Sequence, residues 1–510
     1  MFYFRRIGTT GPLCATIVAA AGLFAAGPIL AQTPELTDEV KVDWGKTTVS
    51  KSTPTLQVVV NPMLLRGAKL HDSSFAALHA LGADYVRYVP WLPYPRQAVA
   101  ELDPPSSTTT AWDFSHIDPT LDDFMKSTEG HSVILNFSTI PAWMYKTDKP
   151  VTYPDDPNQV FWNYTQGTDL RDPTMGEISA YFARLLSWYT QGGFMDENGK
   201  RHESGHHYKV AYWEVLNEIE FEHHWTPETY TRFYDAVTAA MLKVDPQLKF
   251  VGLALAQPSK APEMFEYFLN PANHRKGAPL DLISYHFYAT PTSDQDLDNW
   301  QYSFFDQAEG FLNTVRFVET IRKHYSPATR TDLDELGVIL TEDEKEIRHA
   351  GYVAKPEPAA YWNLAGSMYA HLYVECARMG IDVIGESQLV GYRSQFPSVS
   401  MMNYETGAPN ARYWVLKLLK DNFGPGDKLA DTTSPVATYT VQAFATAHGR
   451  KLLVLNKRNR IQTVPLPAEA DGSSVTLVAP STGDNAPKTE TLSGRALTLQ
   501  PFEVAVLTYR

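Results

Sequence analysis

Short apolar runs alternate with longer amphipathic stretches over most of this chain. The short runs are rich in β-branched and aromatic residues, which is typical of buried strands, and the longer stretches have the spacing of helices that bury one face. The predicted strands are residues 56–60, 85–89, 133–137, 210–216, 250–254, 282–287, 338–340 and 383–384. The predicted helices are residues 75–81, 117–125, 178–189, 227–244, 305–324 and 361–379.

Strands that alternate with helices in this way predict an α/β fold, a (β/α)8 TIM barrel of parallel strands. A doubly wound open sheet is the alternative, and such a sheet is expected to carry a Gly-rich phosphate-binding turn after its first strand. Asn61-Pro62-Met63 stands at that place instead. The pattern therefore favours the barrel, which we assign to residues 55–425.

Beyond about Asp421 the pattern changes to short strands separated by turns, at residues 437–444, 451–455, 474–478 and 495–507. Such a pattern predicts a small all-β domain, a C-terminal β-sandwich over residues 426–510. Residues 32–54 read as an extended N-terminal segment and are a candidate strand of the same sandwich.

The first 31 residues have the pattern of a signal peptide. Arg5 and Arg6 precede an apolar, Ala-rich run, and Ala31 is a plausible cleavage point. An uncleaved anchor is the alternative. We expect a secreted or periplasmic protein that has no membrane contact once this segment is removed.

Net charge and aromatic content bear on the partner. The formal net charge is −14, which argues against nucleic acid and against an anionic membrane surface. Aromatic loops follow the second and third predicted strands at residues 90–95 and 141–145, with Trp162 and Tyr164 further along. Such loops are able to wall a cleft over a barrel mouth, where sugar rings stack on aromatic faces.

Two predicted strands end in a glutamate. The run 210–216 leads into Asn217-Glu218, and the run 338–340 leads into Thr341-Glu342. In a (β/α)8 barrel the C-terminal strand ends usually carry the chemistry, and strands four and seven lie across the mouth from each other. Two facing carboxylates are what glycoside hydrolysis requires. A solvated strand end with a helix-capping Asn217 is the alternative.

These motifs resemble those of glycoside hydrolase clan A, most nearly family 39, which contains β-xylosidases and α-L-iduronidases. Supporting motifs occur in the same order along most of the chain. Tyr85-Val86-Arg87 resembles the family's strand-two arginine motif, residues 281–288 resemble its strand-six segment, and residues 497–509 resemble the last strands of its accessory sandwich. Two positions depart from the family pattern, with Ile219 in place of proline and Val89 in place of histidine.

The resemblance implies a retaining O-glycosyl hydrolase that acts on plant or microbial oligo- or polysaccharides, β-xylosidase-like by default, without metal or cofactor. Glu218 would be the acid/base and Glu342 the nucleophile, about 5 Å apart. Asn217 would hold the sugar 2-hydroxyl, and Arg87, His286 and Tyr288 would surround the nucleophile.

Further candidates have two interpretations each. His223 would touch the substrate or belong to the surface structure, and Glu386 would bind a sugar hydroxyl or pair with a cation. A metal-dependent barrel hydrolase is one rival function, with the ligands drawn from His202, His206 and His207. The other rival is a carbohydrate-binding protein without turnover.

Overall fold

The computed structural model describes residues 39–164, 167–291, 296–348, 352 and 356–510. The predicted signal peptide, residues 1–31, and the start of the N-terminal segment, residues 32–38, lie outside the described residues. Within the described part of the chain, no helix combines the length and the apolar character that a membrane crossing requires.

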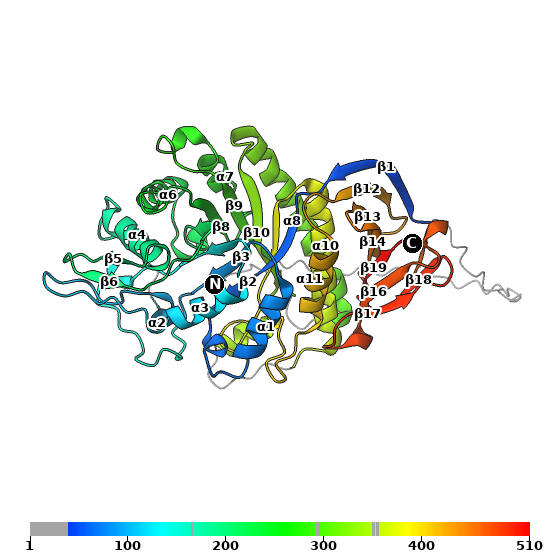
Figure 1. The fold of residues 1–510 in the computed structure, drawn as a ribbon, viewed down its shortest axis with the longest axis horizontal. Helices are drawn as coiled ribbons and strands as arrows, with labels where there is room; N and C mark the ends of the chain where they lie inside the picture. Colours follow the sequence, from blue (N-terminus) through cyan, green and yellow to red (C-terminus); the bar gives the residue numbers. More distant parts are fainter. Residues whose placement is uncertain (1–38, 165–166, 292–295, 349–351, 353–355) are drawn as a thin grey trace, which may run out of the picture. The chain divides into compact units, whose positions relative to one another are not determined.

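Eight parallel strands close into a barrel in the order β10-β11-β2-β3-β4-β7-β8-β9 (Figure 1). This arrangement confirms the predicted (β/α)8 fold. The strands are β2 (Thr53–Val59), β3 (Val86–Val89), β4 (Val133–Leu135), β7 (Tyr212–Glu214), β8 (Lys249–Leu255), β9 (Leu282–Ala289), β10 (Arg330–Val338) and β11 (Val383–Glu386). A separate hairpin of β5 (Gly193–Met195) and β6 (Arg201–Glu203) precedes β7.

The helices coincide with the amphipathic stretches of the sequence. The longer ones are α1 (His71–Leu81), α3 (Asp118–Ser127), α4 (Gly176–Thr190), α6 (Pro227–Met241), α7 (Pro262–Phe268), α8 (Leu297–Tyr325), α10 (Ala359–Met379) and α11 (Ala411–Asn422), and α2 (Pro95–Ala98), α5 (Ile219–Glu222) and α9 (Thr341–Arg348) are short. Local chemistry sets their ends. The Thr226 hydroxyl accepts from the Thr229 N–H at the start of α6, with Pro227 at the first position, and α1 ends at Gly82 with a left-handed φ of 58°.

The seventh strand is not where the sequence pattern placed it. The prediction of a strand at residues 338–340 is wrong, because β10 runs from Arg330 to Val338. Its pairing with β9 shifts between Asp332 and Glu335, which marks a β-bulge. Adjacent residues of a regular strand face opposite sides, but a bulge re-aims one of them. Asp334 and Glu335 therefore both face the barrel interior, and the strand does not read as an apolar run.

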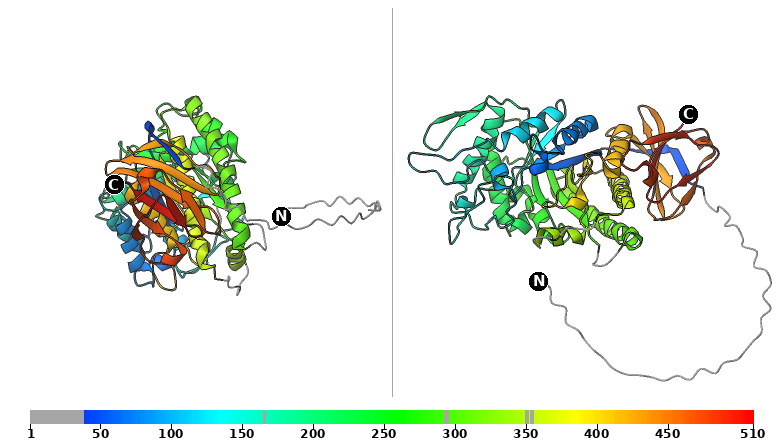
Figure 2. Two further views of the ribbon diagram at one scale, coloured as in Figure 1. Left: turned by 90° about the vertical axis from the view of Figure 1, so that its right-hand side faces the viewer. Right: turned by 90° about the horizontal axis from the view of Figure 1, so that it is seen from below.

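An antiparallel sandwich follows the barrel (Figure 2). Its main sheet has the order β1-β12-β13-β14-β19-β16-β17, and β15 and β18 form a second, two-stranded sheet. The strands are β1 (Lys41–Val49), β12 (Lys428–Thr433), β13 (Tyr439–Thr446), β14 (Gly449–Asn456), β15 (Gln462–Pro465), β16 (Ser474–Val478), β17 (Lys488–Thr491), β18 (Ala496–Leu499) and β19 (Val504–Thr508). The N-terminal segment thus contributes β1, which pairs with β12.

Alternation along β14 shows how the sandwich joins the barrel. Leu453 and Leu455 belong to the large core shared with the barrel helices, whereas Leu452 and Val454 belong to the separate core inside the sandwich. Polar contacts tie the sheet to α10, with Ser367 donating to the Asn456 carbonyl at 2.8 Å. The central strands β13, β14 and β19 are therefore buried on both faces, which explains why they are apolar.

Candidate active site

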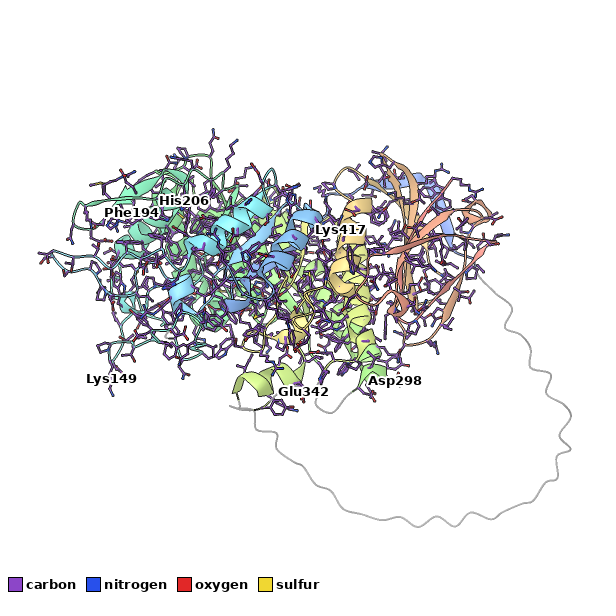
Figure 3. All side chains as sticks on the ribbon, turned by 60° about the horizontal axis from the view of Figure 1, so that its bottom comes forward. Lys149, Phe194, His206, Asp298, Glu342 and Lys417 are labelled. Carbon is purple, nitrogen blue, oxygen red and sulfur yellow. The ribbon has the colours of Figure 1, made fainter. Side chains whose placement is uncertain are left out.

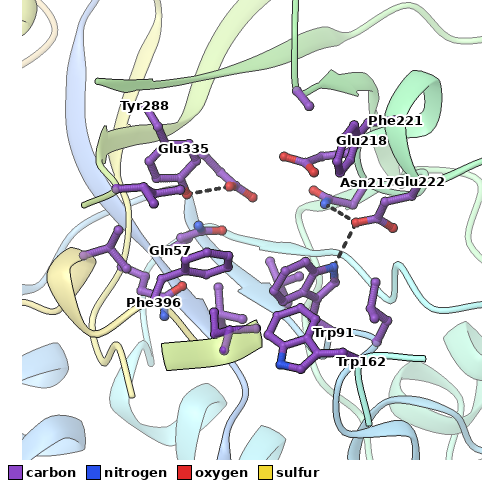
Figure 4. Close-up of a pocket in the computed structure, with 18 of the residues that line it drawn as sticks. Gln57, Trp91, Trp162, Asn217, Glu218, Phe221, Glu222, Tyr288, Glu335 and Phe396 are labelled. Atoms are coloured by element: carbon purple, nitrogen blue, oxygen red, sulfur yellow. Dashed lines mark hydrogen bonds between the residues drawn. The ribbon is translucent and has the colours of Figure 1, made fainter. Parts of the chain in front are cut away.

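A cavity of about 590 Å³ opens where the barrel strands end (Figure 4). Its wall contains nine polar side chains and eleven apolar ones. The polar set is Gln57, Tyr164, Asn217, Glu218, Glu222, Gln257, Tyr288, Glu335 and Gln388. A concave, mostly apolar pocket with a few convergent polar groups is the usual form of a small-molecule site.

Glu218 reaches this cavity through a sharp turn after β7. Leu216 and Glu218 take left-handed φ values of 68° and 44°, which non-glycine residues seldom adopt. The Glu218 N–H donates to the Ala254 carbonyl at 2.8 Å, which fixes the turn against β8. Backbone of this kind costs energy and persists where its surroundings determine it, often at functional sites.

Glu335 of β10 faces Glu218 across the cavity (Figure 4). A carboxylate oxygen of each residue and a ring nitrogen of His286 all lie within 4.8 Å of one another. His286 Nδ1 is 3.0 Å from Glu218 Oε1 and 3.6 Å from Glu335 Oε2. The imidazole therefore lies close to both carboxylates, and its Nδ1 hydrogen-bonds Glu218.

Two donors hydrogen-bond Glu335. Arg87 Nη1 donates to Oε1 at 2.5 Å, and the Tyr288 hydroxyl donates to Oε2 at 2.7 Å. Tyr288 is itself 2.6 Å from Ser387 Oγ, to which Gln57 Nε2 donates at 2.7 Å. An ionised carboxylate only accepts hydrogen bonds, so the Tyr288 hydroxyl donates to Glu335. The Ser387 hydroxyl is then left to donate to Tyr288.

Arg87 is the buried centre of the network. Besides Glu335 it contacts Glu214, Asp334, Gln57 and Asn217, whose Oδ1 accepts from Nη2 at 2.7 Å. Burial on its own would lower the pKa of the guanidinium, but Glu214, Asp334 and Glu335 raise it well above its usual range. Arg87 is therefore a permanent cation beneath the pocket, and its hydrogen-bonding groups are directed at protein acceptors.

Burial disfavours the ionisation of two carboxyl groups below the pocket, those of Glu214 and Asp332. Burial raises the pKa of Glu214 to about 7, partly opposed by Arg87 and reinforced by Asp334. Burial also raises the pKa of Asp332 well above its usual range, and neighbouring Asp334 adds to the effect. Glu214 is therefore only partly ionised near neutral pH, and the ionisation of Asp332 is disfavoured, which limits the negative charge that Arg87 must balance.

His286 belongs to the same network. Burial would lower the pKa of its imidazole, but Glu335 and Asp334 outweigh burial and raise the pKa well above its usual value. The ring is therefore an imidazolium, whose Nδ1 hydrogen-bonds Glu218 at 3.0 Å and whose Nε2 lies 3.5 Å from Asp334 Oδ1. Among the described residues, Glu218, His286 and Glu335 form the one group of metal-capable side chains within 4.8 Å.

The prediction that Glu342 ends strand seven and faces Glu218 is wrong. Glu342 lies in α9, where it accepts from Lys345 at 2.6 Å and contacts Tyr352 (Figure 3). It is not among the side chains that line the cavity. Arg87 and Tyr288, which were predicted to contact Glu342, contact Glu335 instead. The reason is that β10 ends at Val338 and its bulge turns Glu335 inward.

Four predicted substrate contacts are not among the side chains that line the cavity. Arg87 and His286 contact the facing carboxylates instead, and His223 and Glu386 have other partners. His223 is buried, with Nδ1 3.0 Å from the Tyr145 hydroxyl, and its ring stacks on Trp225. Glu386 is fully buried and accepts from Arg412 Nε at 2.8 Å, the cation-pairing alternative for this residue. Burial raises the pKa of Glu386 to about 7, although Arg412 opposes the shift.

The histidines of the rival metal site pair with separate carboxylates. His202 contacts Asp196 at 2.8 Å and His206 contacts Asp118 at 3.3 Å, near the β5–β6 hairpin (Figure 3). Together with His207 they form no metal-capable group among the residues that the structure describes.

The sequence pattern did not single out several wall residues. Gln57, Gln388 and Glu222 line the cavity, and Glu222 follows Glu218 on the short helix α5. Trp91, Trp162 and Tyr164 of the wall belong to the aromatic segments that the sequence indicated, whereas Phe396 does not. Trp91, Trp162 and Phe396 form one cluster, in which the Trp91 and Trp162 rings lie 5.3 Å apart (Figure 4).

Known proteins resemble this chain in its overall fold and, separately, in its C-terminal domain. A family model for the C-terminal immunoglobulin-like domain of D-apionate lactonase matches residues 439–507. No curated protein matches the chain.

Solved structures resemble almost the whole chain. A GH51 arabinofuranosidase from Xanthomonas axonopodis pv. citri has a TM-score of 0.63 at 12% identity, covering 92% of this chain and 99% of that one. A glucosidase from Croceicoccus marinus has a TM-score of 0.59 at 13% identity, with coverages of 92% and 98%. A GH30 endoxylanase from Clostridium papyrosolvens C71 has a TM-score of 0.55 at 15% identity, with coverages of 93% and 100%. At these identities the likeness establishes a shared barrel-and-sandwich fold.

Proposed function

We propose that the protein is a retaining O-glycosyl hydrolase in which Glu335 is the nucleophile and Glu218 the acid/base. The separation of their carboxylate oxygens, within 4.8 Å, carries this proposal. Retaining enzymes hold their carboxyl groups about 5–5.5 Å apart, whereas inverting enzymes need about 6.5–9.5 Å to admit a water molecule.

The reaction has two steps. Glu335 attacks the anomeric carbon, the bond to the leaving oxygen breaks, and Glu218 gives that oxygen a proton. A glycosyl ester on Glu335 results. Water then enters, Glu218 removes its proton, and the water oxygen displaces Glu335 from the anomeric carbon.

The contacts of the two glutamates support this division of roles. Arg87 and Tyr288 donate to Glu335 at 2.5 and 2.7 Å, which stabilises negative charge on that carboxylate. Glu218 adjoins Asn217 and accepts from His286 at 3.0 Å. A nucleophile needs a fixed, ionised carboxylate, whereas an acid/base must change its protonation state during the cycle.

For the substrate we propose a β-xylosidase-like activity on oligo- or polysaccharides, in a secreted or periplasmic protein. The resemblance of the sequence motifs to family 39 supports this choice. The names of the similar structures, an arabinofuranosidase, a glucosidase and an endoxylanase, support glycosides as the class and differ in the sugar.

A screen of aryl glycosides of xylose, arabinose, galactose, glucose and uronic acids tests the proposal. We expect the wild type to turn over at least one substrate. The turnover rate should fall by at least about 1,000-fold in Glu335→Gln. Glu342→Gln is the matched control, because Glu342 lies on α9 outside the cavity wall, and it is expected to retain full activity. Sugar binding without any turnover would favour the non-catalytic alternative.

A lactonase is a second candidate, because residues 439–507 match the C-terminal domain model of D-apionate lactonase. A lactone carbonyl would accept attack from Glu335 or from water in the same pocket. Acid release from sugar lactones, followed by titration, separates the two functions: lactone hydrolysis without aryl glycoside turnover would favour the lactonase.

A further inference from the structure

The pocket contains a third carboxyl group, that of Glu222, which the two-glutamate mechanism does not use. Glu222 is the last residue of α5 and lines the cavity. One of its oxygens, Oε1, accepts from Trp91 Nε1 at 2.8 Å and from Asn217 Nδ2 at 3.1 Å (Figure 4). A single oxygen thus joins the aromatic wall to the end of the β7 turn.

These contacts fix the Asn217 amide at both ends. Arg87 Nη2 donates to its Oδ1 at 2.7 Å, and Glu222 receives one hydrogen of its Nδ2. An amide nitrogen has two hydrogens. Because Asn217 lines the cavity, the second hydrogen is the one available to a substrate hydroxyl, and its direction depends on Glu222.

The same oxygen orients Trp91. Its indole N–H is held by Glu222, while its ring packs on Trp162 at 5.3 Å and lies 6.4 Å from Phe396. The ring that would stack on a sugar and the amide that would hold a sugar hydroxyl are therefore placed relative to each other through Glu222. Positioning of this kind matters because small displacements of bound groups cost large factors in rate.

We propose that Glu222 is a positioning residue that sets how strongly Asn217 binds the hydroxyl next to the anomeric carbon of the substrate. This inference rests on the proposed glycosidase function. Glu222 acts through Asn217 and Trp91 rather than on the reacting atoms, and its acceptor oxygen is the feature required.

Deleting the hydroxyl from the substrate tests the inference. We compare kcat/KM for an aryl glycoside and for its 2-deoxy analogue in the wild type, Glu222→Leu and Glu222→Gln. Leucine removes the acceptor at similar volume, and we expect a loss of at least about 30-fold with the hydroxylated substrate but less than about 3-fold with the 2-deoxy analogue. Glutamine keeps an acceptor oxygen and is expected to stay within about 5-fold of wild type on both substrates.

Glu220→Leu is the matched control on the same helix. Glu220 accepts from the Gln257 backbone N–H at 2.7 Å and is not among the cavity-lining residues. Its effect should be equal on the two substrates. If Glu222→Leu does not fold, Trp91→Phe removes one of the two donors to Glu222 and should still weaken the hydroxylated substrate more than the 2-deoxy analogue.

Equal losses on both substrates in the Glu222 variants would overturn the inference, because a merely structural role does not depend on one hydroxyl. A glutamine variant as impaired as the leucine variant would overturn it too. Neither result bears on the proposed glycosidase function, which is tested separately by the activity of Glu335→Gln and by the stereochemistry of the product.

Discussion

Carboxylate oxygens of Glu218 and Glu335 lie within 4.8 Å of each other, with His286 Nδ1 3.0 Å from Glu218. Glu218 follows β7 and Glu335 lies on β10, and these two strands are not neighbours in the barrel. Because a separation of about 5 Å leaves no room for a water molecule behind the sugar, this pair favours direct attack by one carboxylate.

Azide should rescue the two alanine variants with opposite stereochemistry. In Glu335→Ala the anion enters the vacated space and attacks in place of the carboxylate, so that the product is a glycosyl azide of inverted configuration. In Glu218→Ala the ester on Glu335 still forms with a good leaving group, and azide attacks it to give retained configuration. Proton NMR of the products distinguishes the outcomes, and an exchange of the two results would reverse the roles.

Loss of the Tyr288 hydroxyl should slow catalysis without unfolding the protein. Tyr288→Phe removes the donor 2.7 Å from Glu335 Oε2 and preserves the ring. A hydrogen bond to a charged group is worth about 1.5–3 kcal/mol, so kcat/KM should fall by about 10–100-fold. Steady-state kinetics and a melting curve check this expectation. Unchanged kinetics would show that Tyr288 does not support the nucleophile.

The elements that carry Arg87, Asn217, Glu218, His286 and Tyr288 were predictable from the sequence, because each lies at or near the end of an apolar run. Glu335 was not. Its strand carries Asp332 and Asp334 as well. Asp334 is balanced by Arg87 of β3 and His286 of β9, and burial raises the pKa of Asp332 well above its usual range. Hydrophobic periodicity does not record such pairing, and a bulge breaks the period itself.

Glu222 was overlooked for a different reason. Its role depends on where the chain goes after Glu218, through a left-handed turn into the short helix α5. Sequence spacing does not give the path of such a turn, and Trp91, which contacts Glu222, is remote in sequence. Residues that meet through loops therefore required the structure, as did Glu335 on its bulged strand.

Tryptophan fluorescence should report the ionisation of Glu222. Burial raises the pKa of Glu222 to about 8, and neighbouring Glu218 adds to the shift. Since Trp91 Nε1 donates to this carboxyl group, emission should change as pH rises through about 8 and the group becomes charged. Glu222→Gln should lack this transition. A transition that persists unchanged in the variant would assign it to another group.

Stability should decrease as pH rises from about 5 to 8. Glu214 and Glu386 have folded-state pKa values of about 7, above the ordinary value of 4.5. The folded state therefore binds more protons than the unfolded state in this window, and deprotonation costs stability as pH rises. The raised pKa of His286 acts in the same direction. A melting temperature measured at pH 5.5 should exceed that at pH 8 by roughly 5 °C.

Glu386→Gln serves as the check on that pH dependence. The variant has no titrating group beside Arg412, so its melting temperature should vary less steeply with pH than that of the wild type. A melting temperature that rises between pH 5.5 and 8 would show that these carboxyl groups are not protonated in the folded state.

Covalent trapping tests the central assignment most directly. A 2-deoxy-2-fluoro glycosyl fluoride of the preferred sugar slows both steps through its electronegative fluorine, while its good leaving group keeps the first step faster than the second. The glycosyl-enzyme should then accumulate, and mass spectrometry of the digested protein should find the sugar on the peptide that contains Glu335. The label should be absent from Glu335→Gln and present in Glu342→Gln. A label on Glu342 or Glu218, or turnover of glycosides with no label on Glu335, would contradict the account.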